Sequence, residues 1–153
     1  MRYEHPKDDD QLIRDLEPLL EEAGADLVQF GHSHLWNRFQ GPTGVNFLET
    51  SNVGNTFGAF VEGGPRQCVV PPAPGWTPEF YSAFGDPYGL EPITPTVNPV
   101  RDAEGRPQPF LSSNEITVFT ILDTADGVLT SYAFDTREPE SEVFVLDRFS
   151  IDD

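Results

Sequence analysis

The histidines of this chain are the residues whose type and spacing are best suited to chemistry. The chain contains three of them: His5 near its start, and His32 and His34 in the tetrapeptide Gly31-His32-Ser33-His34. Residues i and i+2 of an extended backbone point to the same side, and Gly31 permits a tight turn, so both rings of the pair can face one point. Imidazole is a common ligand of zinc, iron and manganese ions. The pattern predicts that His5, His32 and His34 bind metal.

The segments around the histidines are predicted to bring the three rings to one edge of a sheet. A short strand ending at His5 precedes a helix, and residues 26–30 read as a buried strand. Strands joined by such a helix run parallel and finish at the same edge, where open α/β sheets bind their ligands. The helix should be kinked at Pro18 and capped by Gly24. Its apolar stripe consists of Leu12, Ile13, Leu16, Leu19, Leu20 and Ala23.

The middle of the chain is predicted to contain one strand and then a long excursion. Residues 45–50 read as a strand after a Gly-Pro-Thr-Gly turn, whereas residues 32–39 read as a loop or a short irregular piece. Residues 54–114 are rich in proline, which excludes long helices and central strands. The aromatic residues between positions 76 and 88 are interpreted equally well as a lid over the metal site and as a loop that packs on itself.

The C-terminal segment is predicted to be an antiparallel β-meander. Three strands rich in β-branched and aromatic residues are expected there, and Asp126-Gly127 is a hairpin signal between the first two. These strands cover residues 116–122, 128–134 and 143–149. The chain is therefore interpreted as a single partial domain of the α/β (α+β) class. Its parts are a strand–helix–strand unit, an excursion and a set of antiparallel strands, in residues 1–53, 54–114 and 115–153.

The composition argues against charge-driven binding to nucleic acid or to anionic lipid. The chain has 26 acidic and 9 basic residues, a formal charge of −17, and such a surface repels phosphates. Cys68 is the only cysteine, so an internal disulfide is excluded. No apolar run approaches the roughly 20 residues that span a bilayer, and the N-terminus lacks the apolar segment of a signal peptide. The compartment stays open, with a lean towards an extracytoplasmic location for the full-length protein.

The order of elements over residues 2–52 matches that of a known superfamily. A His-Pro element at His5, an amphipathic helix and a strand leading into Gly-His-x-His follow one another. This arrangement resembles the calcineurin-like metallophosphoesterases, which include the purple acid phosphatases. The resemblance implies the C-terminal part of a four-layer α/β/β/α sandwich that hydrolyses a phosphomonoester or phosphodiester at a two-metal site. The terminal strands match the second sheet of that sandwich only loosely.

The resemblance also implies a role for each candidate site residue. His5 and His32 would bind one metal ion and His34 the other, the two ions being Mn, Fe or Zn. Together the ions would clamp the phosphate ester and activate a water nucleophile. Arg38 would contact the substrate phosphate through bidentate hydrogen bonds, although a surface ion pair is the interpretation we favour for this residue.

The superfamily carries further metal-binding motifs upstream of the region that matches residues 2–52. The bridging Asp of a Gly-Asp element and a Gly-Asn-His motif are expected upstream, and Gly54-Asn55 is followed here by Thr56. We therefore expect Met1 to be an internal start, and activity to need the missing N-terminal half of the fold, in cis or in trans. Two alternatives stay open: a mononuclear zinc site made by the three histidines, and a non-catalytic β-rich interaction module.

Overall fold

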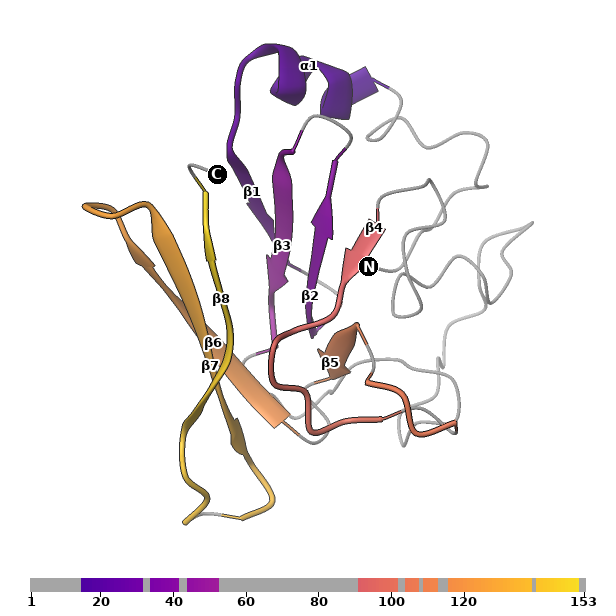
Figure 1. Cartoon of the computed structure of the whole chain (residues 1–153), viewed down its shortest axis with the longest axis vertical. Coiled ribbons are helices and arrows are strands. Elements are labelled where there is room, and N and C mark those ends of the chain that lie inside the picture. Colours follow the sequence, from indigo (N-terminus) through magenta and orange to yellow (C-terminus); the bar gives the residue numbers. More distant parts are fainter. Residues whose placement is uncertain are drawn as a thin grey trace.

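The computed structural model of the chain describes one short helix and eight strands, which form two facing sheets (Figure 1). The structure describes residues 15–31, 34–41, 44–52, 91–101, 104–107, 109–112, 116–138 and 140–151. Over these ranges the fold is mostly β, which agrees with the coarse α+β class predicted from the sequence. None of the helical structure in them is long and apolar enough to cross a bilayer.

The first sheet is built around two central strands, β2 (Leu35–Gln40) and β3 (Asn46–Thr50). Strand β3 pairs in parallel with β1 (Leu27–Phe30) on one side and antiparallel with β2 on the other. Two short strands, β4 (Glu91–Ile93) and β5 (Phe110–Ser112), both pair with the remaining side of β2. The spatial order is therefore β1-β3-β2, with β4 and β5 sharing the last edge.

Two predicted strands of this sheet are confirmed, and one predicted loop is wrong. Strands β1 and β3 fall within the predicted ranges 26–30 and 45–50. Residues 35–40, however, form β2 instead of an irregular segment. They include no β-branched residue, but both faces of the strand are buried, with Trp36 in one hydrophobic cluster and Phe39 in another. Packing on two sides outweighs the weak intrinsic preference of this segment.

The excursion predicted for residues 54–114 contributes only edge strands where the structure describes it. Strand β4 contains Pro92, opposite Phe39 of β2, and a proline is tolerated at an edge because its missing N–H removes no central hydrogen bond. The predicted aromatic cluster between positions 76 and 88 lies outside the described residues. The prolines thus correctly predict that this region supplies no central strand where it is described. The two edge strands themselves were not predicted.

A tight turn joins β2 to β3, as the glycines of this segment predict. The Gly41 N–H donates to the Val45 carbonyl at 2.9 Å, and the Gly44 N–H donates to the Gly41 carbonyl at 3.0 Å. Gly44 has φ of 99°, a conformation that a side chain would strain. The turn therefore sets the register in which β2 and β3 pair.

The second sheet is the predicted antiparallel meander. It consists of β6 (Ile116–Asp123), β7 (Val128–Asp135) and β8 (Phe144–Ser150), each paired with the next. The predicted hairpin joins β6 to β7, and Gly127 has the left-handed φ of 63° that the turn requires. The three strands agree with the predicted ranges to within one residue at each end.

A bulge in β8 breaks the strict alternation of its side chains. Ser131 is opposite Asp147 while Tyr132 is opposite Val145, so Leu146 is the extra residue. A bulge lets two successive side chains lie on the same side of a sheet. Leu146 and Asp147 are in fact both buried between the sheets. The bulge therefore brings a carboxylate into an otherwise apolar interface.

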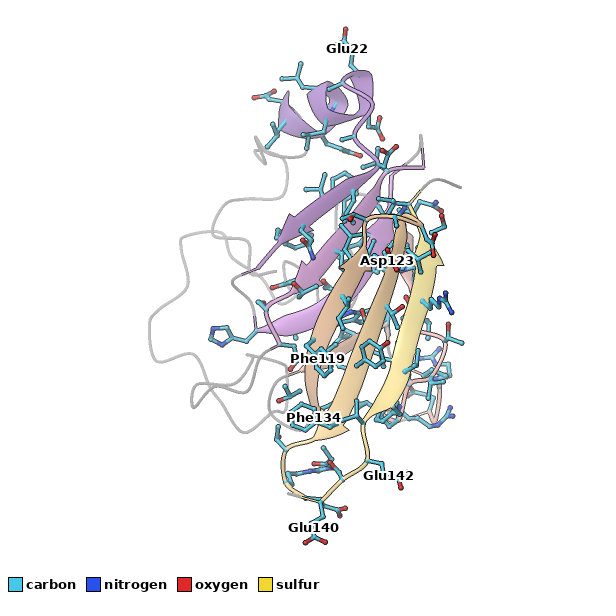
Figure 2. The ribbon with its side chains drawn as sticks, turned by 90° about the vertical axis from the view of Figure 1, so that its left-hand side faces the viewer. Glu22, Phe119, Asp123, Phe134, Glu140 and Glu142 are labelled. Atoms are coloured by element: carbon cyan, nitrogen blue, oxygen red, sulfur yellow. The ribbon has the colours of Figure 1, made fainter. Side chains whose placement is uncertain are left out.

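The main core lies between the two sheets. Trp36 of β2 donates its indole N–H to the Ser131 hydroxyl of β7 at 3.0 Å, so the two sheets share a buried hydrogen bond. Figure 2 looks onto the opposite, outer face of the second sheet, where Phe119 stacks on Tyr132 with ring centroids 5.3 Å apart. The buried members of the core are Trp36, Leu48, Leu111, Ile116, Val118, Leu129, Ala133 and Leu146.

The helix α1 (Glu17–Glu22) ends as predicted but begins differently. Gly24 has φ of 70°, and the N–H groups after the helix bond back to the carbonyls of Leu20 and Glu21, which caps its C-terminus. Pro18 lies in the first turn of α1, and residues 15 and 16 immediately before it are π-helical. The helical path is therefore irregular just before Pro18, where the sequence predicts a kink.

The apolar stripe predicted for this helix is exposed where the structure describes it. Leu16 and Leu19 are 44% and 59% exposed, and no residue of α1 is buried. Leu12 and Ile13, which belong to the same predicted stripe, lie outside the described residues. The described part of the helix thus adds little to the core.

An ion pair joins the two sheets beside the tryptophan. Arg38 Nε donates to Asp147 Oδ2 at 3.0 Å, and the two side chains are only 11% and 2% exposed. The other carboxylate oxygen accepts hydrogen bonds from the Thr96 N–H and hydroxyl, at 3.3 and 3.0 Å. The guanidinium also lies 4.1 Å from the ring centroid of Phe149. The pair is therefore hydrogen-bonded on both sides, as a buried charge requires.

Breaking this ion pair from one side should destabilise the fold. We expect Asp147→Ala to lower the free energy of unfolding by about 3 kcal/mol, because it leaves the Arg38 guanidinium buried without its carboxylate. The exposed pair Arg106–Glu104 provides the control, and Arg106→Ala should change stability by less than about 0.5 kcal/mol. Urea unfolding measures both. Equal effects of the two variants would contradict the buried role of Asp147.

A second prediction concerns the turn that follows β7. The Arg137 side chain and backbone N–H both donate hydrogen bonds to Asp135, which lowers the pKa of that carboxyl group from 3.8 to about 2. Its contribution to stability is therefore present above pH 3.8 and lost as the pH falls through about 2. NMR titration of the Asp135 carboxyl carbon should show this pKa, and Arg137→Ala should raise it towards 3.8. Arg106→Ala should leave it unchanged; an unshifted pKa in Arg137→Ala would refute the assignment.

Candidate functional site

His34 is the one predicted metal ligand that the structure describes. It lies between the end of β1 and the start of β2, and it is half-buried. Its backbone has φ of 61°, the left-handed conformation that residues other than glycine rarely adopt. The backbone at His34 is therefore not extended, and the period-two argument for a shared direction with His32 does not apply at this residue. His5 and His32 lie outside the described residues, so their convergence with His34 stays a prediction.

Gly31 has a different role from the predicted one. Within the described residues it is not among those with positive φ, so it is not the position that demands a glycine conformation. A Cβ atom at Gly31 would instead lie 3.1 Å from the Cβ of Ser51. The close approach of the end of β1 to Ser51 is what favours glycine here.

Ser51 also bonds to the other end of the histidine segment. Its hydroxyl accepts a hydrogen bond from the His34 N–H at 2.9 Å, and its own N–H donates to the Leu35 carbonyl at 3.1 Å. The hydroxyl proton is directed to Glu49, since Oγ lies 2.7 Å from Glu49 Oε1 and 3.4 Å from the Leu35 carbonyl. Ser51 thus contacts both residues that flank the undescribed pair of positions 32 and 33.

Buried polar side chains surround this point on the outer face of the first sheet. Glu49 of β3 is opposite Asn37 of β2, and each is 1% exposed. Two residues further along the same face, Phe39 of β2 is opposite Phe47 of β3, and both belong to an apolar cluster. The face therefore changes from apolar to polar towards the carboxyl end of β3. Among the described residues, neither amide atom of Asn37 has a hydrogen-bond partner, which is a costly arrangement for a buried group.

These polar residues had no predicted role, although the sequence contains a signal for one of them. Glu49 interrupts a strand that is otherwise apolar on this face, since Phe47 two residues earlier points to the same side. A carboxylate in such a position is expensive to bury unless it is hydrogen-bonded. The alternation along β3 could therefore have marked Glu49 as a residue retained for something other than packing.

Arg38 lies on the face of β2 opposite to the polar cluster. Its guanidinium bonds to Asp147 of the second sheet and, at 3.4 Å, to Asn46 Oδ1 of β3. The side chain therefore lies on the face of the first sheet that packs against the second sheet. The favoured prediction for Arg38 was a surface ion pair, and the structure has an ion pair that is mostly buried. Contact of Arg38 with a substrate phosphate stays a prediction.

Within the described residues, this end of the first sheet has side chains able to bind metal but not a complete set of metal ligands. There, no group of three or more His, Cys, Asp or Glu side chains is placed to hold a metal ion, and His34 is the one histidine among these residues. Comparison of the chain with models of protein families, with curated proteins and with solved structures finds no match in any of the three. The function must therefore be inferred from the residues of the site themselves.

The left-handed backbone of His34 makes a direct prediction. We expect His34→Gly to be more stable than His34→Ala by about 1 kcal/mol, because both variants lose the ring but only glycine relieves the left-handed strain. The same pair of substitutions at exposed Gln29, within β1, should have the opposite order, since glycine weakens a strand. Urea unfolding of the four variants measures this. An alanine variant at position 34 as stable as the glycine variant would show that the strain is absent.

Proposed function

We propose that this chain supplies the C-terminal part of a metal-dependent phosphoesterase, with His5, His32 and His34 as metal ligands. The observation that carries the proposal is the position of His34. It follows β1 at the carboxyl end of the parallel pair β1–β3, and its backbone N–H bonds to Ser51, whose hydroxyl donates to the buried Glu49. Ligand sites of sheets with parallel strands gather at this edge. The Gly-His-x-His motif and its resemblance to the calcineurin-like superfamily support the same function.

The finer architecture belongs to this proposal as well. Two facing sheets are compatible with the inner layers of a four-layer α/β/β/α sandwich, whereas α1 lies at the end of the first sheet, before β1 begins (Figure 1). Such a sandwich would need further segments to cover the outer surfaces. Two apolar surfaces are available for them, namely the leucines of α1 and the outer face of the second sheet. The exposed residues there include Leu16, Leu19, Phe119, Ile121 and Val145.

The chemistry proposed is hydrolysis of a phosphomonoester or phosphodiester by two metal ions of the Mn, Fe or Zn type. Bound ions stabilise negative charge on the transferred phosphoryl group and lower the pKa of a water molecule to make a nucleophile. Imidazole nitrogens suit these ions. The ligands that this chain lacks would come from the missing N-terminal half of the fold, in cis or in trans. We propose that the chain alone binds metal weakly and is inactive.

One observation favours a second candidate, a non-catalytic interaction module. The outer face of the second sheet exposes Ile121 and Val145, 54% and 46% exposed, around the stacked rings of Phe119 and Tyr132 (Figure 2). Exposed apolar surface of this kind often marks a protein interface. In that case the histidines would be incidental, and their removal would change neither metal content nor activity.

The test replaces the two histidines of the motif together. In the chain alone, we expect His32→Ala/His34→Ala to weaken binding of Co²⁺, measured by its absorption spectrum, by more than about 100-fold, because imidazole ligands are lost. Asp126→Asn, a change at one of many exposed carboxylates, should have no effect and controls for binding to the acidic surface. In the chain joined to the segment encoded upstream, the double variant should lose hydrolysis of a generic phosphodiester with Mn²⁺.

The other outcomes separate the alternatives. One zinc ion bound tightly per isolated chain would favour the mononuclear site made by three histidines. Metal content and hydrolysis that survive the double substitution would overturn the phosphoesterase proposal and favour the interaction module. The phosphoesterase proposal also fails if neither the upstream coding region nor a partner chain encodes the Gly-Asp and Gly-Asn-His motifs.

A further inference from the structure

We infer that Ser51 and Glu49 are positioning residues, which clamp the backbone at His34 and so fix the direction of its ring. The consequence at the metal rests on the proposed function, whereas the clamp itself is independent of metal. Neither residue belongs to the Gly-His-x-His motif, and both come from β3 or its end, the strand that follows β2 in sequence.

Ser51 touches the Gly31–His34 segment at both ends. At Gly31 the approach is so close that a Cβ atom would lie 3.1 Å from the Ser51 Cβ. At His34 the Ser51 hydroxyl accepts the backbone N–H at 2.9 Å. Both described residues next to positions 32 and 33 are therefore packed or hydrogen-bonded against Ser51, and His34 is the histidine whose backbone this side chain holds.

The hydrogen bond at His34 holds an unfavourable conformation. A left-handed backbone at a residue other than glycine persists only when its surroundings impose it, and such residues cluster at functional sites. The His34 N–H donates to Ser51, and the Ser51 N–H binds the adjoining Leu35 carbonyl. Together these two bonds fix the peptide on each side of the transition from the turn into β2.

Glu49 gives the serine hydroxyl its orientation. The hydroxyl has one proton, and the short distance of 2.7 Å to Glu49 Oε1 directs that proton to the carboxylate. The oxygen lone pairs then remain available to the His34 N–H. This hydrogen bond is short, so the hydroxyl is held in this orientation. Glu49 is 1% exposed, and its bond to Ser51 satisfies one of its two carboxyl oxygens in this buried position.

Residues that hold a metal ligand from behind affect metal affinity far more than they affect the fold. Substitution of such residues weakens binding by about 10- to 100-fold in metal sites generally. A residue that only stabilises the sheet would change the urea midpoint without changing the geometry of the ligand. The two roles are therefore separated by comparing Ser51 with a serine that is equally well bonded elsewhere.

The experiment uses Ser51→Ala with Ser131→Ala as its matched control. Ser131 is buried in the second sheet and bonds to the Trp36 indole and the Thr120 hydroxyl, so its replacement removes a comparable set of hydrogen bonds. It does not contact the turn that contains His34. We expect Ser51→Ala to weaken Co²⁺ binding by about 10-fold and to speed hydrogen exchange at the His34 amide by at least about 10-fold. Ser131→Ala should lower the urea midpoint while leaving both quantities unchanged.

Glu49 provides the conservative comparison. Glu49→Gln keeps an acceptor oxygen for the Ser51 hydroxyl and should retain most of the metal affinity, whereas Glu49→Ala should reproduce the loss seen in Ser51→Ala. Equal His34 exchange rates and equal metal affinities in the Ser51 and Ser131 variants would overturn the inference.

Failure of the proposed function gives a different pattern. If the parent chain and the His32→Ala/His34→Ala variant bind Co²⁺ equally, the phosphoesterase proposal fails. The exchange rate at His34 still decides the clamp in that case, because it is measured without metal. Faster exchange in Ser51→Ala alone supports the clamp, and unchanged exchange overturns it.

Discussion

The alternation of side chains along β2 gives the two faces of the first sheet different tasks. Trp36 and Arg38 point towards the second sheet and bond to Ser131 and Asp147, while Asn37 between them belongs to the opposite face. A slip of one residue in this strand would exchange the two sets and place the guanidinium in the outer cluster. The turn closed by Gly41 and the pairing with β3 prevent that slip. Core and candidate site therefore both depend on one register.

The buried ion pair between the two sheets is possible because strand β8 contains a bulge next to Asp147. The bulge at Leu146 turns Asp147 inward, opposite an arginine that lies on a regular strand. Thr96, from the segment after β4, supplies the remaining hydrogen bonds to that carboxylate. An ion pair in an apolar interface adds less stability than well-packed apolar groups would, but it specifies which sheet positions face each other. It thus acts on alignment more than on strength.

Local patterns in the sequence predict the elements well where the signal is local. Apolar residues next to glycine turns mark β1 and β3, β-branched residues mark the meander, and Gly24 marks the end of the helix. Strand β2 was missed because its conformation depends on burial on two sides, which no short window contains. Ser51 and Glu49 were missed as site residues because their contacts with the histidine segment are distant in sequence. The convergence of the three histidines, with two of them outside the described residues, stays a prediction.

Two adjacent residues at the end of β3 hold different neighbours, and only the second of them also bonds to the second sheet. Ser51 holds the turn before β2, whereas the Asn52 side chain donates to the Leu111 carbonyl and its own carbonyl accepts the Val118 N–H, each at 2.9 Å. The bond that holds the His34 backbone and the bond that ties β3 to β6 therefore come from neighbouring residues. A residue inserted between positions 51 and 52 would change this spacing and displace one of the two bonds.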